Sequence, residues 1–157
     1  MMLLHDTIIV RRELAIPVGE VFRAWQDTGQ LEAWCYPGDA NWTSRIEAHE
    51  FTIGGVKQAV FGPKGAAPYR EESRYLDIRH DRHIINSERI LSGEGHLISA
   101  SLVAIEFVET VKGCELVVSD QITLLDEADN AEQRRDGWNE VLDRLEPFLQ
   151  RAELRSP

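Results

Sequence analysis

The feature of the sequence that most constrains the fold is a change of hydrophobic period near residue 125. From about residue 43 to residue 125, apolar side chains occur in short alternating runs, as in half-buried β-strands. Beyond residue 130 they recur every three or four positions, as on one face of an α-helix. The strand-like runs are separated by turn-forming segments, namely Gly54-Gly55, Gly62-Pro63-Lys64-Gly65, His80-Asp81, Ser92-Gly93-Glu94-Gly95 and Lys112-Gly113. We therefore expect six strands and then one long helix.

The two clearest strands are expected at residues 98–109 and 115–125, and they form a long hairpin. In each strand, alternate residues share one face. The first strand places on that face Ser101, Val103, Ile105 and Phe107. The second places on it Leu116, Val118, Asp120 and Ile122.

The N-terminal segment predicts a strand and two short helices. The strand covers residues 5–16, and one of its faces carries Ile8, Val10, Arg12, Leu14 and Ile16. Pro17 begins a helix whose apolar side is formed by Val18, Val21, Phe22 and Trp25. Gly29 is expected to interrupt this helix. Leu31 and Trp34 then indicate a second helix that ends before Pro37.

The last helix is expected over residues 131–152. Asn130 and Gln133 resemble a capping box at its start. About 22 residues would give a length of roughly 33 Å, enough to cross the domain. Its apolar stripe consists of Trp138, Val141, Leu142, Leu145, Phe148 and Leu149. Pro147 predicts a kink or a late irregular turn, and the acidic run at 126–129 is read as a solvated segment before the helix.

The order of elements predicts an α+β fold in a single domain spanning residues 1–157. An antiparallel sheet of about seven strands has one apolar face to cover, and the C-terminal helix is long enough to cover it. A strongly curved sheet around one helix leaves a space between the two layers unless large side chains fill it. A chain of 157 residues is long enough to bury one core.

Composition and charge exclude several classes of protein. The formal net charge is −10, which repels a nucleic-acid backbone. No apolar run approaches the roughly 18 residues of a spanning helix, and the N-terminal segment lacks the pattern of a signal peptide. Cys35 and Cys114 fit neither a metal motif nor a disulfide framework. We therefore expect a reduced, cytoplasmic protein with two buried or idle thiols, no nucleic-acid partner and no integral membrane segment.

Several segments together resemble the START-like (SRPBCC, birch-pollen-allergen-like) superfamily, in the branch of the activator of heat-shock-protein-90 ATPase homologues. The opening match lies in residues 16–34 and includes Pro17, Glu20, Val21-Phe22, Ala24-Trp25, Asp27, Leu31 and Trp34. The remaining matches are Ile53-Gly54-Gly55, Tyr75-Leu76-Asp77-Ile78, Ser101-Leu102-Val103, Ile105-Glu106-Phe107, residues 113–119 and residues 137–145. The likeness covers nearly the whole chain.

This resemblance implies a helix-grip fold around a cavity, with relatives that bind lipids, polyketides or hormones, and it implies no cofactor. The chain departs from the family pattern at two places. Cys35-Tyr36-Pro37 follows Trp34 where a second tryptophan is common, so the lip of the cavity is expected to differ. Asp120 stands where relatives often carry His or Glu. The resemblance does not imply the heat-shock-protein role of the family name, because in the eukaryotic relatives that activity involves additional domain surface that we do not expect 157 residues to contain.

Asp120 is the most informative candidate. Its strand parity places it on the covered face, where an isolated charge is costly unless it is paired or hydrogen-bonded. A ligand or a catalytic role is one interpretation. The alternatives are an internal ion pair with Arg12 or Arg74, or a strand end that is open to water.

The other candidate residues are expected to line the cavity. Ser101 offers a hydroxyl or merely relieves packing, because no motif that would activate a serine surrounds it. Gly137 weakens its helix, which suggests that either the sheet or a ligand approaches its backbone closely. The ligand-binding residues predicted from the sequence are Trp25, Trp34, Tyr36, Trp42, Tyr75, Ser101, Val103, Asp120, Trp138 and Leu142. The six aromatic rings in this set either fill space or favour a flat, apolar ligand.

A metal site receives little support from the sequence. His80 and His83 have a plausible ligand spacing, but they lie in a polar turn and no third ligand is evident. We expect neither a metal nor a cofactor.

Three functions fit these patterns. The preferred one is binding of a small hydrophobic or aromatic ligand, such as a lipid or polyketide, by a non-catalytic carrier or sensor. The first alternative is a cyclase, dehydratase or hydrolase that uses Asp120 for proton transfer in the same cavity. The second is a chaperone-associated protein-interaction module. A homodimer through a strand edge or the region of Trp42 also fits the sequence.

Overall fold

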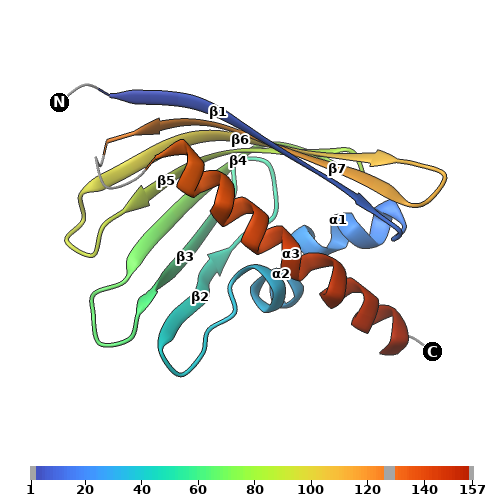
Figure 1. Ribbon diagram of the computed structural model, residues 1–157, viewed down its shortest axis with the longest axis horizontal. Helices are drawn as coiled ribbons and strands as arrows, with labels where there is room; N and C mark the ends of the chain where they lie inside the picture. Colours follow the sequence, from blue (N-terminus) through green and yellow to red (C-terminus); the bar gives the residue numbers. More distant parts are fainter. Residues whose placement is uncertain (1–2, 126–129, 156–157) are drawn as a thin grey trace.

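The computed structural model describes residues 3–125 and 130–155, and it contains the expected elements in the expected order. The strands are β1 (Leu4–Leu14), β2 (Trp42–His49), β3 (Val56–Pro63), β4 (Tyr69–Arg79), β5 (His83–Leu91), β6 (Leu97–Glu109) and β7 (Cys114–Leu124). The helices are α1 (Val18–Gln26), α2 (Thr28–Cys35) and α3 (Ala131–Arg155). Figure 1 shows α3 lying across the concave side of the curved sheet, with α1 and α2 at one end.

The seven strands form one antiparallel sheet in the order β1-β7-β6-β5-β4-β3-β2. The first and second strands of the chain therefore form the two edges. Register shifts interrupt three of the strand pairs, at Ile46/Ala48, Tyr75/Asp77 and Ile90/Leu91. Irregularities of this kind bend strands and increase their twist, which is consistent with the strong curvature seen in Figure 1.

The break between α1 and α2 lies at Asp27. The sequence had suggested a break at Gly29. Asp27 has extended backbone angles, and its side chain accepts a hydrogen bond from the Gln30 N–H at 2.9 Å. It therefore acts as an N-cap for α2. Gly29 lies inside the first turn of α2, so the prediction of a break at this glycine is wrong.

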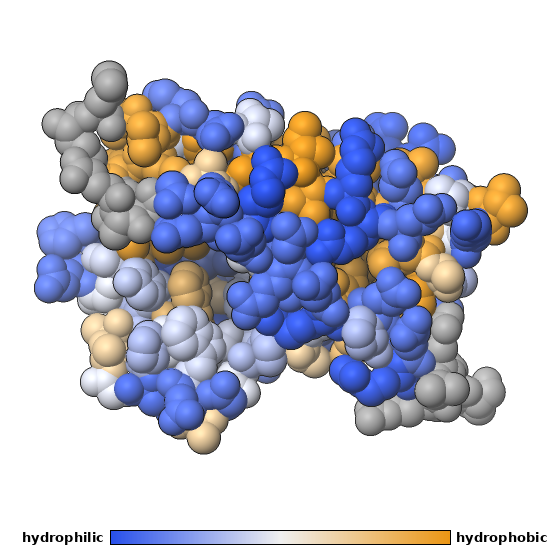
Figure 2. All heavy atoms as spheres, in the orientation of Figure 1, coloured by the Kyte–Doolittle hydropathy of each residue, from blue (hydrophilic) through white to orange (hydrophobic). Residues whose placement is uncertain are grey.

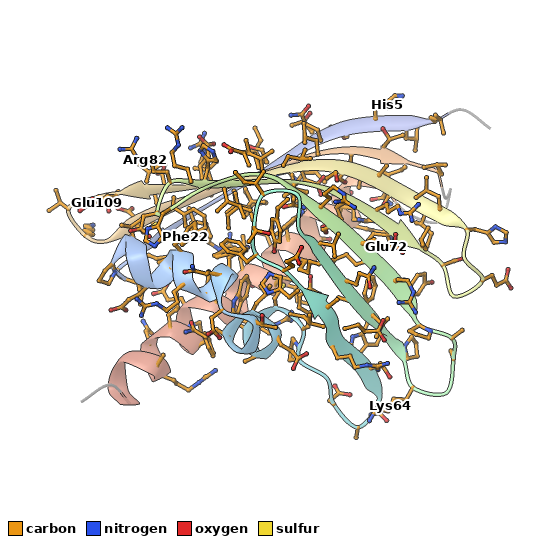
Figure 3. The ribbon with its side chains drawn as sticks, turned by 180° about the vertical axis from the view of Figure 1, so that it is seen from behind. His5, Phe22, Lys64, Glu72, Arg82 and Glu109 are labelled. Carbon is orange, nitrogen blue, oxygen red and sulfur yellow. The ribbon has the colours of Figure 1, made fainter. Side chains whose placement is uncertain are left out.

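Aromatic contacts fix α1 and α2 under the sheet. The Phe22 ring packs edge-on against Phe51 and Phe107, with centroid separations of 5.8 and 5.2 Å. Figure 3 shows Phe22 reaching from α1 toward the sheet. Trp25 packs against Trp34 at 4.7 Å, and the Trp34 indole donates a hydrogen bond to the Ala24 carbonyl at 2.9 Å. The two short helices are thereby joined by buried side chains.

The C-terminal helix begins with the predicted cap, because the Asn130 side chain accepts a hydrogen bond from the Gln133 N–H at 2.8 Å. The expected apolar stripe is present, with Leu142, Leu145 and Leu149 buried. The expected irregular turn at Pro147 is absent, since α3 remains helical through this residue to Arg155. The acidic run at 126–129 lies outside the described residues. Hydrophilic side chains cover the outward face of α3 (Figure 2).

The packing of α3 leaves the middle of the sheet uncovered. The helix makes its main contacts with β1, α2 and α1. Arg12, on the concave face of β1, donates hydrogen bonds to Asn139 at 3.0 Å and to Asp143 at 2.9 Å. The helix is thus held at one edge of the sheet and at the α1–α2 end. Among the described helices, none has the length and apolar character needed to span a membrane.

A cavity between the sheet and the C-terminal helix

A cavity of about 1080 Å³ occupies the space between the concave face of the sheet and α3. Its walls come from α1, α2, the segment that follows α2, strands β2 to β7, and the first half of α3. The mouth lies beside α3 on the side of β2 and β3, where Figure 2 shows a recess in the surface. Pockets that bind small molecules commonly measure about 300–1000 Å³, so this space is large enough for one.

Most of the residues predicted from the sequence do line this cavity, namely Trp25, Trp34, Tyr36, Trp42, Tyr75, Val103, Asp120 and Trp138. Two of the predicted residues do not line it. Leu142 is only 2% exposed and belongs to the core under α3. Ser101 lies on the concave face, but its hydroxyl is buried and has no hydrogen-bond partner.

Asp120 is buried to 1% exposure on the cavity wall, as its strand parity predicts. Its Oδ2 atom accepts a hydrogen bond from the Trp138 indole N–H at 3.0 Å, whereas its Oδ1 atom is buried without a partner. The suggested ion pairs are not formed. Arg12 binds residues of α3, and Arg74 donates to the Gly54 carbonyl at 2.6 Å. The low exposure also excludes a strand end that is open to water.

A buried ion pair lies on the opposite side of the cavity and was not predicted from the sequence. The Lys57 ammonium lies 3.2 Å from the Glu71 carboxylate, and the Tyr36 hydroxyl donates a hydrogen bond to the same carboxylate at 2.6 Å. Burial alone would lower the pKa of Lys57, but Glu71 and the neighbouring phenols raise it well above its usual value. Burial, together with Glu71, raises the pKa of Tyr36. Lys57 therefore stays charged and Tyr36 stays neutral near pH 7.

Glu88 is a second acidic group of the cavity that the sequence reasoning missed. Glu88 lies on β5. In the strand register it is opposite Ser73 of β4 on one side and opposite Ser101 of β6 on the other. Both serine hydroxyls are buried without hydrogen-bond partners. Burial raises the pKa of Glu88 from 4.5 to about 8, and the nearby carboxylates of Glu71 and Asp120 act in the same direction. The side chain is therefore largely protonated at neutral pH.

These missed residues share a signal that was present in the sequence. Alternation in β5 places on one face Ile84, Asn86, Glu88 and Ile90. In β4, alternate residues place Tyr69, Glu71, Ser73 and Tyr75 on the same face of the sheet. Polar residues among apolar ones on the covered face of a strand indicate a binding site. They can be recognised only after it is known which face of each strand is covered.

The cysteine and histidine side chains in and near the cavity are poor candidates for a reactive group. Cys35 lines the cavity, and burial raises the pKa of its thiol to about 12, so it is a poor nucleophile. Cys114 is a buried free thiol in β7. His49 does not line the cavity, although its Nε2 atom lies 2.8 Å from the Tyr75 hydroxyl. Burial and Lys57 lower the pKa of His49 to about 4, so its ring is neutral at pH 7.

The histidine pair considered for a metal is engaged elsewhere. His83 lies 2.7 Å from the Asp77 carboxylate, and His80 lies 3.3 Å from Asp81. Within residues 3–125 and 130–155, no three His, Cys, Asp or Glu side chains form a group that could hold a metal ion.

Gly137 lines the cavity, and apart from its chain neighbours and the backbone of its own helix no protein atom lies within 4 Å of the position that a Cβ atom would occupy there. The sheet therefore does not approach this glycine closely, which corrects one of the two interpretations of it. Nearby, Arg134 donates a hydrogen bond to Ser99 at 2.7 Å. Arg144 donates to the carbonyls of Trp34 and Cys35 at 2.9 and 3.3 Å, and thus connects α3 to the end of α2.

The fold of this chain is similar to that of several proteins of known structure. An uncharacterized protein from Rhizobium leguminosarum is 27% identical, with 96% of this chain and 97% of that chain covered and a TM-score of 0.85. The Mll3558 protein from Rhizobium loti is 26% identical, with 94% and 99% covered and a TM-score of 0.85. The CV1439 protein from Chromobacterium violaceum is 21% identical with a TM-score of 0.77, with 92% and 97% covered, and shows a similar fold.

No curated protein matches the chain. The family model that does match it is described as Activator of Hsp90 ATPase homolog 1-like protein, and the match covers residues 15–150. This range includes the cavity-lining parts of both short helices, of strands β2 to β7 and of α3. The helix-grip fold and the extent of this match together show that the chain belongs to the family of Activator of Hsp90 ATPase homolog 1-like proteins.

Proposed function

We propose that the protein binds a small hydrophobic or aromatic molecule in the cavity between the sheet and α3, as a carrier or sensor. The observation that carries this proposal is a space of about 1080 Å³ whose wall combines apolar rings with one buried carboxylate oxygen, Oδ1 of Asp120, that lacks a partner. A protein interior is normally packed to high density, and a concave space of this size leaves the side chains of its wall without protein neighbours on one side. Its presence in a folded domain favours a role in ligand binding.

The composition of the wall indicates a ligand with two different ends. The half-buried ring of Trp138 and the buried rings of Trp25 and Trp34 form apolar parts of the cavity wall. Asp120 and Glu88 lie on strands of the same wall. A molecule with a flat apolar body and a polar end would satisfy both parts of it.

Native mass spectrometry of gently purified protein, with a thermal-shift screen of lipids and aromatic metabolites, tests this function. We expect a co-purified or added compound to raise the unfolding temperature. Gly137→Leu should weaken that binding about tenfold or more, because the added side chain would occupy open space at the cavity wall. Asp136→Leu is a matched control, since Asp136 is exposed on the same helix and does not line the cavity. Equal binding by both variants would contradict the proposed location.

A second function, proton transfer on a bound substrate, is supported by Glu88. A carboxyl group whose pKa is raised to about 8 can act as a general acid at neutral pH, and Asp120 in the same cavity can accept a proton. Compounds found by the binding screen should then be converted to products detectable by mass spectrometry. Glu88→Gln should abolish that conversion while the compound still binds. Recovery of every bound compound unchanged would favour the carrier function.

A further inference from the structure

The charged side chains that line the cavity are mostly acidic. Three basic residues face five acidic ones in the set Lys57, Arg134, Arg144, Asp39, Glu71, Glu88, Asp120 and Glu140, which leaves a formal excess of two negative charges when Glu88 is ionised and of one when it is protonated. The basic groups have protein partners. Lys57 is paired with Glu71, Arg134 donates to Ser99, and Arg144 donates to backbone carbonyls. The wall therefore offers a ligand acidic groups more readily than basic ones.

Asp120 supplies the most specific requirement. Its Oδ1 atom is on a side chain that is only 1% exposed, and it receives no hydrogen bond. A buried carboxylate oxygen without a donor carries a large desolvation penalty. A neutral ligand group that donates a hydrogen bond would remove part of this penalty, and a positively charged donor would remove most of it.

Strand geometry places Glu88 on the same wall as Asp120. In the register, Asp120 pairs with Val103 and Val103 with Asn86, which is two residues from Glu88 on β5. Two strand spacings and two residues correspond to about 12 Å between the α-carbons, and the concave curvature directs both side chains toward the same space. The aromatic rings of the wall add faces that attract cations.

We infer that the polar end of the ligand is an organic cation with N–H donors, such as an amidinium, a guanidinium or a protonated amine, held by Asp120 and Glu88. This inference rests on the proposed binding function and specifies its ligand class. The cation lies toward β5 and β7, and the apolar body of the ligand lies among the tryptophan rings. The net charge of −10 on the whole chain attracts cations in the same sense.

Binding of a cation is coupled to a proton on Glu88. The charged groups that act on Glu88 are Glu71 on β4, Lys57 on β3, Asp120 on β7 and Arg134 on α3. A cation favours the ionised carboxylate, so affinity increases as pH rises toward the Glu88 pKa of about 8. From pH 7 to pH 9 the ionised fraction, and with it the affinity, increases about tenfold. The Cys35 thiol, with a pKa of about 12, and the Lys57 ammonium do not change charge in this range.

Three naphthalene compounds of nearly identical shape test the inference. 2-Naphthamidine is a cation across this pH range, 2-naphthamide is neutral, and 2-naphthoate is an anion. Isothermal titration calorimetry at pH 7 and pH 9 measures their affinities. We expect the amidine to bind at least about tenfold more tightly than the amide, the naphthoate to bind most weakly, and only the amidine to gain affinity at pH 9.

Matched variants assign the effect to the two carboxylates. Asp120→Asn should weaken amidine binding about tenfold or more and leave amide binding within about threefold. Glu88→Gln should remove the pH dependence of amidine binding. Glu106→Gln, on the neighbouring strand with an exposed side chain outside the cavity, should change neither. Thermal unfolding of each variant shows that the comparison is between folded proteins.

The outcomes separate this inference from the binding function. If the amide or the naphthoate binds as tightly as the amidine, the cation preference is wrong, while ligand binding in the cavity stands. Amidine affinity that does not change between pH 7 and pH 9 in the unmodified protein also overturns the role of Glu88. Failure of all three compounds to bind would contradict the proposed function itself.

Discussion

At the scale of single residues, Asp120 is a buried charged side chain in a position where an apolar residue would favour the stability of the fold. One oxygen of its carboxylate accepts a hydrogen bond from Trp138, and the other is buried without a partner. Buried polar groups in folded proteins are nearly always satisfied, so an exception at a cavity wall indicates a group kept for an interaction with something else. The buried hydroxyls of Ser73 and Ser101 also lack partners, but these two residues flank Glu88 in the strand register and lie outside the cavity lining.

The Trp138 hydrogen bond should be a measurable part of the folding energy. Trp138→Phe removes the indole donor and leaves both oxygens of Asp120 without a partner, so we expect a loss of about 1–3 kcal/mol in the free energy of unfolding. In an Asp120→Asn background the loss should be smaller, because a neutral amide needs the donor less. Urea denaturation of the four proteins in this cycle measures the coupling. Equal losses in both backgrounds would show that the bond is energetically unimportant.

Glu88 should make stability depend on pH. A folded-state pKa of about 8, against an ordinary value of 4.5, means that ionisation opposes folding. Its favourable contribution is complete below about pH 4.5 and is lost as pH rises to 8. Glu88→Gln should therefore stabilise the protein above pH 8, and by much less at pH 4.

The shift in the pKa of Glu88 limits this effect to about 5 kcal/mol, and partial exposure of the side chain reduces the expected gain to about 1–3 kcal/mol. Denaturation curves at pH 4 and pH 8.5 measure it. Glu106→Gln serves as the control, and a pH-independent difference between Glu88→Gln and the unmodified protein would rule out the linkage.

The sequence predicted Asp120 but not Glu88, Lys57 or Glu71, and the reason is physical. Asp120 follows a long alternating run in β7, which assigns its face without further information. The strands β3 to β5 mix charged and apolar residues, and isolated charges on such strands usually face solvent. Strand pairing resolves this ambiguity, because Lys57, Ser73 and Glu88 occupy successive positions of one cross-strand row.

At the scale of elements, periodicity predicted the order and type of every strand and helix in the described part of the chain. The local breaks were harder to predict. Gly29 was expected to end α1, but Asp27 ends it, because an extended residue with a capping carboxylate stops one helix and starts the next. Pro147 was expected to cause a kink or a late irregular turn, and the irregular turn is absent because helical backbone continues through it. Tertiary packing of the stripe that includes Leu145 and Leu149 stabilises the turn that contains Pro147.

Gly137 provides a test of α3. Glycine in a helix interior costs about 0.5–1 kcal/mol relative to alanine, and an added Cβ here meets no atom within 4 Å. Gly137→Ala should therefore stabilise the protein by about that amount, as measured by thermal or urea unfolding. A destabilised Gly137→Ala protein would mean that the helix needs the glycine for a reason other than space.

At the scale of the whole molecule, the cavity results from how α3 is attached. The helix is held mainly by Arg12 of β1 and by α1 and α2, so strands β4 and β5 and the middle of β6 face the cavity. The sequence could not predict this volume, because the same tryptophans and tyrosines would fill the space or line it with equal burial. The family resemblance implied a cavity, and the side-chain positions show which polar groups lie on its wall.

The buried Lys57–Glu71 pair offers a test of whether the interior is arranged for stability or for binding. Their side chains are 13% and 11% exposed, and the Tyr36 hydroxyl donates to the same carboxylate. Lys57→Met leaves Glu71 buried without its counter-ion, so we expect a loss of about 3 kcal/mol in the free energy of unfolding. Replacing the whole group, as Lys57→Met/Glu71→Leu/Tyr36→Phe, should restore the original stability to within about 1 kcal/mol or exceed it.

The triple variant should nevertheless lose affinity for any ligand whose polar atoms contact this side of the cavity, because none of its three new side chains can form a hydrogen bond there. Urea denaturation gives the stabilities, and calorimetry with a compound from the binding screen gives the affinities. If the triple variant is as unstable as Lys57→Met, the ion pair is needed for the fold. If it is stable and binds normally, these three residues belong to neither the ligand site nor the stabilising core. A stable protein with weakened binding is the result expected of a wall whose polar groups serve the ligand.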